Sequence, residues 1–275
     1  MCVEQAVAEH YGQPDLLQRI EAALRDSGKD PAHPTVDDLA GVDEFHARGR
    51  EATLELAAWL PVDPSTEILD IGSGLGGPAR FLAASRGWRI VGIDLTPSYV
   101  ETANELTRRC GLADRARFLT GNALSLPFED GSLAAAYTQH VAMNIPDKAT
   151  LYAEAARVLR PGATFVVYDM LRGPGGPVRF PTPWSADGTT SFLVDLQELQ
   201  RLLEAAGFAV EEQRDSREAA VGWFEARMAA AAAGKAPLVS IRLLLGQQMA
   251  PAFANLVANL RAAAVVPTMV RAVRR

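Results

Sequence analysis

Residues 67–83, EILDIGSGLGGPARFLA, constrain the fold of this 275-residue chain more than any other segment. An apolar, strand-like run leads directly into four closely spaced glycines, and a helix-forming stretch follows at once. Glycines let the backbone turn sharply and approach a ligand, and the free N–H groups at the start of the helix face that ligand. The segment therefore predicts a strand–turn–helix unit that holds a nucleotide-like molecule.

From Glu67 to about residue 216, short β-rich runs alternate with amphipathic helical runs. The runs RIVGID and ATFVVYDM are strand-like, whereas PSYVETANELTRRC has helical spacing. This alternation is typical of right-handed crossovers and predicts an α/β fold, a doubly wound, mainly parallel sheet with helices on both faces. Ligands of such sheets bind at the carboxyl ends of the strands, so we expect the site there.

Further segments flank this alternating region within what we predict to be a single domain over residues 1–275. The segment 172–190 is rich in Gly and Pro, as irregular loops are, and 217–264 has helical spacing. Both are expected to converge with the N-terminal helices on the ligand edge of the sheet and to form a lid. The predicted parts are an N-terminal helical cap at 1–60, a cofactor-binding core at 67–216, lid insertions at 172–190 and 217–264, and a last strand at 265–275.

Composition excludes several classes of partner. The formal charge of −6, without a Lys/Arg patch interleaved with aromatics, argues against a nucleic-acid partner. The first residues show no basic region followed by an apolar run, so we expect no secretory signal, and no apolar run approaches the roughly 20 residues of a membrane span. Two cysteines and four histidines show no paired ligand spacing. We expect a soluble, cytoplasmic protein without a metal site; its oligomeric state stays open.

The glycines alone do not select the cofactor, because they fit two patterns. One is G-x-G-x-x-G, the dinucleotide fingerprint, and the other is D-x-G-x-G-x-G, which suits S-adenosylmethionine. Asp70 places a carboxylate at the strand end, where the cationic amino-acid part of S-adenosylmethionine is favoured and a pyrophosphate is not. Asp94 can accept hydrogen bonds from the ribose of either cofactor. An NAD-dependent oxidoreductase and a non-catalytic binding module remain alternatives.

Together with FLTGNALSLPFEDGSLAAAYTQH at 118–140, these motifs resemble the class I S-adenosylmethionine-dependent methyltransferases, the broad family of ubiquinone-pathway, sterol, tocopherol and sarcosine/dimethylglycine methyltransferases. The resemblance covers roughly residues 40–215 and implies a seven-stranded, Rossmann-like methyltransferase sheet with S-adenosyl-L-methionine as cofactor. The runs GLGGPAR, TQHVAMNI and DEFHARGREAT narrow it toward the sarcosine/dimethylglycine-like branch. Sterol-type C-methyltransferases share GGPAR, so the run marks a branch and not an acceptor.

The resemblance also implies which residues bind the cofactor. The 70–76 segment would hold the methionine end, Asp94 the ribose, Leu95 the adenine face, and Asn122 with Ala123 the adenine edge. The family often has Asp where this chain has Asn122, whose amide oxygen can still accept from an adenine amino group. The predicted cofactor-binding residues are Asp70, Gly72, Ser73, Gly74, Gly76, Asp94, Leu95, Asn122, Ala123 and Gln139.

Methyl transfer from a sulfonium is an in-line displacement, so most of the catalysis can come from holding the nucleophile about 3 Å from the methyl carbon. Three residues are candidate catalytic groups. His140 either orients or deprotonates the acceptor, or only bonds to the backbone. Asp169 either pairs with an ammonium acceptor or fixes the 172–190 loop. Tyr11 either closes over the methyl donor or packs as an ordinary core residue.

The acceptor is expected to be a small molecule, and two classes are open. An isoprenoid-like or specialised metabolite, methylated on carbon or oxygen, predicts an apolar cavity under the lid. A sarcosine-like amine, methylated on nitrogen, predicts a small polar cavity lined by Asp169 and arginines. Candidate lining residues, which can equally be plain core or solvated surface residues, are Phe180, Trp184, Trp223, Phe224 and Met228, with Arg172, Arg179, His46 and Arg50 as candidate polar contacts.

Overall fold

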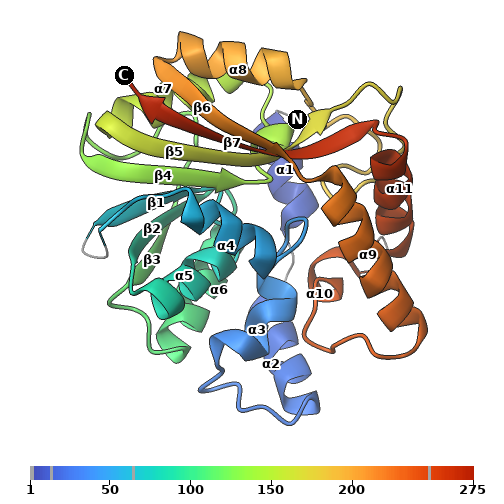
Figure 1. The fold of residues 1–275 in the computed structure, drawn as a ribbon. Helices are drawn as coiled ribbons and strands as arrows, with labels where there is room; N and C mark the ends of the chain where they lie inside the picture. Colours follow the sequence, from blue (N-terminus) through green and yellow to red (C-terminus); the bar gives the residue numbers. More distant parts are fainter. Residues whose placement is uncertain (1–2, 13–14, 64–65, 247–248) are drawn as a thin grey trace.

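The computed structural model describes residues 3–12, 15–63, 66–246 and 249–275. Residues 1–2 and 13–14 of the predicted cap, and 247–248 of the predicted lid, lie outside the described residues. A seven-stranded sheet with the order β3-β2-β1-β4-β5-β7-β6 forms the centre of the molecule (Figure 1). The strands are β1 (Glu67–Ile71), β2 (Arg89–Asp94), β3 (Ala116–Thr120), β4 (Leu133–Gln139), β5 (Leu159–Arg172), β6 (Phe208–Asp215) and β7 (Val265–Arg274).

The strand directions confirm the predicted fold class. β1 to β5 pair in parallel, and β7 alone runs antiparallel to its two neighbours, β5 and β6. The chain moves outward from β1 to β3 and then returns to place β4 on the other side of β1. The carboxyl ends of β1 and β4 therefore border a topological switch point, which is where ligands of such sheets bind.

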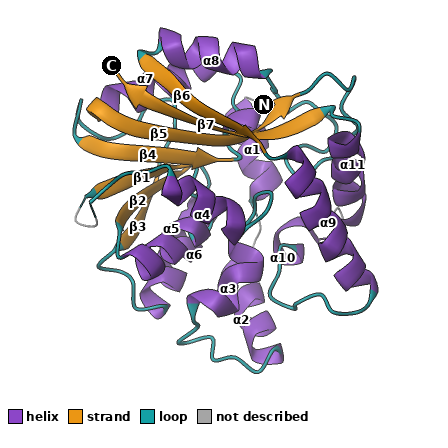
Figure 2. Cartoon of the chain, in the orientation of Figure 1, coloured by secondary structure: helices purple, strands orange, loops and turns teal. Residues whose placement is uncertain are grey.

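Helices cover both faces of the sheet (Figure 2). Successive residues of a strand point to opposite faces, so Ile68 packs in one core cluster with α4, α5 and α6, whereas Leu69 packs in another with α7 and α8. This two-sided burial explains the near-continuous apolar sequence of the inner strands. The helices that flank the sheet are α4 (Arg50–Ala58), α5 (Gly77–Arg86), α6 (Pro97–Arg109), α7 (Lys148–Val158) and α8 (Leu196–Ala205).

The remaining helices gather at the carboxyl edge of the parallel strands. α9 and α11 pack against each other and against β7, and α10 packs against α2 and α3. In Figure 1, α1 and the group α9 to α11 lie at the same end of the sheet. None of the described helices has the length and apolarity needed to cross a membrane. The elements are α1 (Val3–Tyr11), α2 (Leu16–Asp26), α3 (Val36–Asp43), the short helix η1 (Ala142–Asn144), α9 (Arg217–Ala232), α10 (Arg242–Leu245) and α11 (Met249–Arg261).

Candidate active site

A cavity of about 370 Å³ opens at the carboxyl ends of the central strands. One set of lining residues, here called the glycine-turn side, comes from the strand ends and the glycine-rich turn. It contains every predicted cofactor-binding residue except Gly76: Asp70, Gly72, Ser73, Gly74, Asp94, Leu95, Asn122, Ala123 and Gln139. A second set, here called the aromatic side, comes mainly from η1, β5, the 172–190 loop and the helices α9 and α11. It contains Met143, Met170, Trp184, Trp223, Phe224, Phe253 and Leu256.

Two carboxylates dominate the electrostatics of the glycine-turn side. Asp70 is 3% exposed and accepts a hydrogen bond of 3.0 Å from the Tyr137 hydroxyl at Oδ2. Burial raises the pKa of Asp70 to about 7, and the nearby charge of Asp94 adds to the shift. Asp94 accepts from the Gly74 N–H at 2.8 Å and from the Thr96 N–H at 2.9 Å, so it anchors the glycine turn. A bound cation would stabilise the ionised form of Asp70 and lower its pKa again.

Several polar atoms on this side have no protein partner. Ser73 Oγ and both amide atoms of Gln139 are buried and form no hydrogen bond within the described structure. An unpaired buried polar group costs about 1–3 kcal/mol, so atoms of this kind at a cavity wall favour a ligand that pairs with them. Such a ligand must carry both donors and acceptors, because the Gln139 amide offers one of each.

The Asn122 amide is engaged differently from the sequence expectation. Its Oδ1 accepts from the Leu124 N–H at 2.9 Å, and its Nδ2 donates to Glu4 Oε1 at 2.7 Å. Oδ1, the oxygen that is expected to accept from adenine, therefore already accepts a hydrogen bond within its own loop. It keeps a second lone pair with which it can accept from a ligand. The contact to Glu4 also ties α1 to this rim of the cavity.

Tyr11 anchors the other end of α1 over the cavity. Its hydroxyl donates to Asn144 Oδ1 at 2.9 Å, and its ring packs edge-on against Phe45 with 6.2 Å between centroids. Asn144 in turn donates to the backbone oxygens of Trp184 and Thr190 in the 172–190 loop. Tyr11 therefore lies inside the cavity wall and connects α1, η1 and the loop, and burial raises the pKa of its hydroxyl far above the usual value.

The aromatic side includes some of the predicted lining residues and excludes others. Trp184, Trp223 and Phe224 line the cavity, whereas Phe180 and Met228 do not, and Met228 is 43% exposed. The candidate polar contacts also divide. His46 lines the cavity, but the three arginines lie elsewhere: Arg172 pairs with Asp195, Arg50 pairs with Asp37, and the backbone of Arg179 bonds to Asn259. Among the lining residues that the structure describes there is no Lys or Arg.

His140 lines the cavity directly after β4. Its N–H donates to the Tyr168 carbonyl at 2.7 Å, its φ of 56° is unusual for a non-glycine residue, and its ring packs on Tyr168 with 4.9 Å between centroids. Nε2 is buried and has no hydrogen-bond partner. Burial lowers the pKa of His140 well below its usual value, so the ring is neutral near pH 7. The neutral ring can exchange a hydrogen bond with a molecule in the cavity.

Asp169, a predicted catalytic residue, is not among the described residues that line the cavity. It is 2% exposed, and its carboxylate accepts from the N–H of Met143 at 3.0 Å and from the N–H of Met170 at 2.8 Å. Burial raises its pKa to about 7, against the opposing charge of Lys148. The carboxylate therefore holds the η1 turn against β5, and the hydrogen bonds described for it lead to these two elements and not to the 172–190 loop.

Comparison with known proteins identifies the central part of this fold. Residues 69–167 match the family model described as a methyltransferase domain. The chain carries a methyltransferase domain. Its matched segment is similar to 24-methylenesterol C-methyltransferase 2 of Oryza sativa subsp. japonica, at 38% identity over 44% of this chain and 34% of the relative. It is also similar to 2-methyl-6-phytyl-1,4-hydroquinone methyltransferase of Synechocystis, at 37% identity over 42% and 36% of the two chains.

Solved structures share the fold of this methyltransferase domain together with its flanking helices. Geranyl diphosphate C-methyltransferase from Streptomyces coelicolor matches with a TM-score of 0.72 at 17% identity, over 100% of this chain and 99% of that chain. A [4+2]-cyclase matches with a TM-score of 0.71 at 22% identity, over 100% and 97%. The chain spans about a third of the length of the two curated relatives named above. These structural matches also cover the segments before residue 69 and after residue 167, which the methyltransferase family model does not match.

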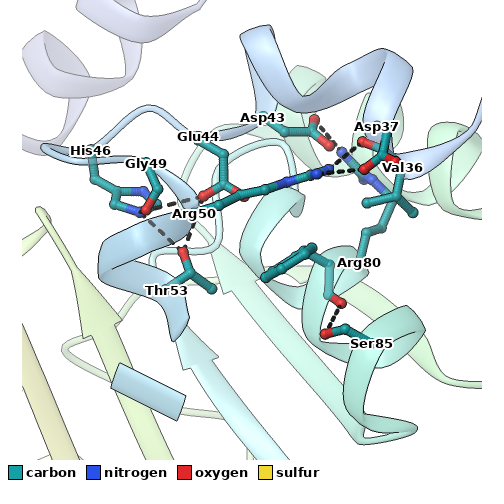
Figure 3. A network of polar contacts seen from close by, with 11 residues as sticks. Val36, Asp37, Asp43, Glu44, His46, Gly49, Arg50, Thr53, Arg80 and Ser85 are labelled. Atoms are coloured by element: carbon teal, nitrogen blue, oxygen red, sulfur yellow. Dashed lines mark hydrogen bonds and ion pairs between the residues drawn. The ribbon is translucent and has the colours of Figure 1, made fainter. Parts of the chain in front are cut away.

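Next to the methyltransferase domain, Glu44 is a cavity residue that the sequence interpretation missed. It is 7% exposed, lines the cavity, and accepts at Oε2 from the Thr53 hydroxyl at 3.1 Å. His46 Nε2 lies 3.4 Å from the same oxygen, and Figure 3 shows the carboxylate between His46 and Arg50. Burial, helped by the charge of Asp43, raises its pKa to about 7. The available signal was the polar run DEFHARGRE, which interrupts two apolar helical stretches.

Asp43 and Arg80 form a second polar pair that the sequence interpretation missed. The side chains are 2% and 0% exposed, and Arg80 Nη2 donates to Asp43 Oδ1 at 2.5 Å. Arg80 also donates to the Ala103 carbonyl and the Thr107 hydroxyl, so it connects α3, α5 and α6. Among the described residues, no group of three or more His, Cys, Asp or Glu side chains is arranged to hold a metal ion.

Substitutions of two glycines in the glycine-rich turn are expected to affect the stability of the fold and the binding of the ligand differently. A Cβ on Gly76 would lie 2.3 Å from the Phe118 ring, whereas a Cβ on Gly74 would meet nothing within 4 Å. We expect Gly76→Ala to lower the free energy of unfolding by roughly 2–5 kcal/mol, from steric overlap and its φ of 74°. Gly74→Ala should lower the free energy of unfolding by only about 1–2 kcal/mol, because only the φ of Gly74 would be strained. The same substitution should weaken the binding of S-adenosylhomocysteine at least about tenfold, because the backbone could no longer approach the ligand as closely. Denaturant unfolding and calorimetry test the pair; equal losses of stability would contradict it.

Proposed function

We propose that this chain is an S-adenosylmethionine-dependent methyltransferase that methylates a small, apolar acceptor on carbon or oxygen. One observation carries the proposal: a single cavity joins an acidic glycine-rich turn to a set of aromatic and Met side chains, without a Lys or Arg among its described lining residues. The first set fits a cationic methyl donor, and the second fits an apolar acceptor. Together they would hold the two reactants side by side in one cavity.

The glycine-turn side fits S-adenosylmethionine better than a dinucleotide. Buried Asp70, with its raised pKa, favours a ligand that brings an ammonium group, whereas a pyrophosphate would meet a carboxylate and no cationic side chain. Unpaired Ser73 Oγ and Gln139 can bond to the polar groups of the cofactor, and Asp94 lies where ribose hydroxyls are expected. When bound, the cofactor would supply an electrophilic methyl group on a sulfonium.

The aromatic side favours an acceptor without a carboxylate or phosphate. Geranyl diphosphate, named for a structural neighbour, carries two phosphates, and a sarcosine-like amine carries a carboxylate. Each would need a cationic partner once it is buried in the cavity, and the described lining offers acidic groups instead. Sterols and prenylated hydroquinones, which the names of two curated relatives indicate, are mostly apolar. An isoprenoid-like acceptor is therefore the class that the cavity suits best.

The chain's own residues would then position the reactants and exclude water. Tyr11 and α1 cover the cavity through contacts to Asn144 and Asn122, so they would close over the methyl donor. The unpaired Nε2 of His140 would accept a hydrogen bond from the acceptor and orient it. Asp169 would act indirectly, because it holds η1, which carries the lining residue Met143.

The proposal is tested by supplying labelled S-adenosylmethionine with four compounds. We expect labelled product from 2-methyl-6-phytyl-1,4-hydroquinone or a 24-methylenesterol, and none from geranyl diphosphate or sarcosine, because the phosphates of the first and the carboxylate of the second would lie unpaired in the cavity. Transfer to only geranyl diphosphate or sarcosine would contradict the acceptor class. Calorimetry with S-adenosylhomocysteine and NADH tests the cofactor separately, and binding of NADH alone would refute the proposed reaction.

A further inference from the structure

If the proposed function is correct, conservation of charge means that the acceptor end of the cavity must accommodate a positive charge during methyl transfer. The acceptor's electron pair forms the bond to the methyl carbon, and the C–S bond breaks with its pair left on sulfur. S-adenosylhomocysteine results, and a neutral acceptor carries one positive charge until it loses a proton. An unpaired charge in an apolar cavity is costly, so a neighbouring anion that can also take the proton would lower the barrier.

Only one lining carboxylate is suited to this task by its contacts. Asp70 and Asp94 belong to the glycine-turn side, where the methyl donor would bind. Asp43 is paired with the buried guanidinium of Arg80. Glu4 is exposed and bonds to Asn122. The described carboxylates that line the cavity are Glu4, Asp43, Glu44, Asp70 and Asp94.

Glu44 has one oxygen that forms no hydrogen bond within the described structure. Oε2 accepts from Thr53, while buried Oε1 has no hydrogen-bond partner. Oε1 forms an ion pair with Arg50, whose Nε lies 3.7 Å away, and this distance is too long for a hydrogen bond. We propose that Glu44 is the catalytic carboxylate that faces the acceptor, balances its positive charge and receives its proton. His46 supports this position: its Nε2 donates to the Gly49 carbonyl at 3.0 Å and borders the same carboxylate (Figure 3).

The charges around Glu44 keep it titratable near neutral pH. Arg50 and Arg80 favour the carboxylate, whereas burial and Asp43 disfavour it, and the balance raises its pKa to about 7. Arg227, which lies over the Trp223 ring at 4.1 Å, also feels its charge, as does the buried Tyr137 hydroxyl. His46 is neutral because burial lowers its pKa to about 4. A base with a pKa near the working pH both accepts and returns a proton efficiently.

The first test measures cation binding and needs no knowledge of the natural acceptor. The probes are N,N-dimethylgeranylamine, a cation, and geraniol, its neutral counterpart, each titrated into protein saturated with S-adenosylhomocysteine. At about pH 8 the wild type should bind the amine at least about tenfold more tightly than the alcohol, since the carboxylate pairs with the cation. Glu44→Gln should lose this preference. Glu51→Gln, which removes an exposed carboxylate of α4, should retain it.

The pH dependence of the preference gives a readout that a structural role would not move. The preference should disappear below about pH 7, as Glu44 becomes protonated. The Thr53 hydroxyl stabilises the carboxylate, so Thr53→Val should raise the pKa of Glu44 and move the midpoint to higher pH. A wild type that does not bind or prefer the amine, or a Glu44→Gln variant that keeps the preference, would overturn the assignment.

The second test uses whichever acceptor of the four-compound assay is methylated. Glu44→Gln should lower kcat at least about 100-fold, within the range of lost general base catalysis, while the KM for S-adenosylmethionine stays unchanged. A variant with wild-type kcat would refute the role of Glu44 and leave the proposed function intact. A wild-type protein that binds no S-adenosylhomocysteine would instead refute the proposed function, and the catalytic role with it.

Discussion

Asp70→Asn is expected to weaken binding of S-adenosylhomocysteine up to about 100-fold, because this ligand keeps the ammonium group of the methyl donor. A hydrogen bond between charged groups contributes about 1.5–3 kcal/mol, and the larger figure corresponds to roughly two powers of ten in affinity. Asparagine preserves the shape of the side chain and can still accept from Tyr137, so the loss reports charge. Calorimetry at fixed pH measures it. Asp114→Asn, an exposed change before β3, should bind like the wild type.

The same contact predicts a pH dependence with a definite sign. Free Asp70 has a pKa of about 7, and only its carboxylate attracts an ammonium group. The affinity of the wild type should therefore fall as the pH drops below about 7, by up to tenfold per pH unit, and binding in that range should release a proton. Asp70→Asn should show a flat profile. An unchanged affinity in this variant would remove Asp70 from the cofactor site.

Arg80→Met is expected to lower the free energy of unfolding by about 3–5 kcal/mol, because it leaves Asp43 buried without its partner. Whole domains are stable by only about 5–15 kcal/mol, so the loss is a large fraction of the total. Met fills a similar space, which limits the contribution of a cavity. Denaturant unfolding followed by circular dichroism measures the change, and Arg86→Ala at the exposed end of α5 should stay within about 0.5 kcal/mol of wild type.

Two further results separate lost charge pairing from lost packing in Arg80→Met. Adding Asp43→Asn should recover part of the stability, because the double variant no longer buries an unpaired charge. The deficit of the single variant should also shrink from about pH 8 to about pH 5, since unpaired Asp43 would bind a proton more readily folded than unfolded. A double variant that is less stable by the sum of both losses would contradict this account.

The fold and the glycine-turn side could be predicted because local sequence patterns determine them. The EILDIG run is buried on both faces as β1, and parallel strands bring Asp70, Asp94 and Gln139 to one edge whatever the loops do. Asn122 shows the limit of this reasoning. Its place in the site follows from the sheet, but its partners, Leu124 and Glu4, depend on a turn and on the docking of α1.

The aromatic side could be predicted only in part, because helical spacing does not show which face of a helix such as α9 meets the cavity. Trp223 and Phe224 face it, whereas Met228, one turn further along α9, is exposed. The contacts of Asp169 could not be predicted from the sequence for a related reason. A carboxylate near a strand end points either toward the ligand edge or into a neighbouring turn, and here the N–H groups of η1 bind it.

Glu44 could not be predicted as a cavity residue, because its position depends on contacts distant in sequence. The Asp43–Arg80 pair holds the end of α3 against α5, and Thr53 of α4 fixes the carboxylate beside His46. In the sequence run DEFHARGRE, Asp43 and Glu44 are two acidic residues among several charged ones, and nothing in the run distinguishes them. Only the packing of α3, α4 and α5 distinguishes Asp43, which is hydrogen-bonded to Arg80, from Glu44, whose Oε1 has no hydrogen bond.

A crystal structure of the complex with S-adenosylhomocysteine tests the central claim most directly, that one cavity joins the cofactor to an apolar acceptor space. We predict the ammonium group beside Asp70, and the sulfur opening toward the space between Met143, Trp184 and Glu44. A ligand bound outside the cavity, or one whose sulfur faces solvent away from these three side chains, would contradict the claim.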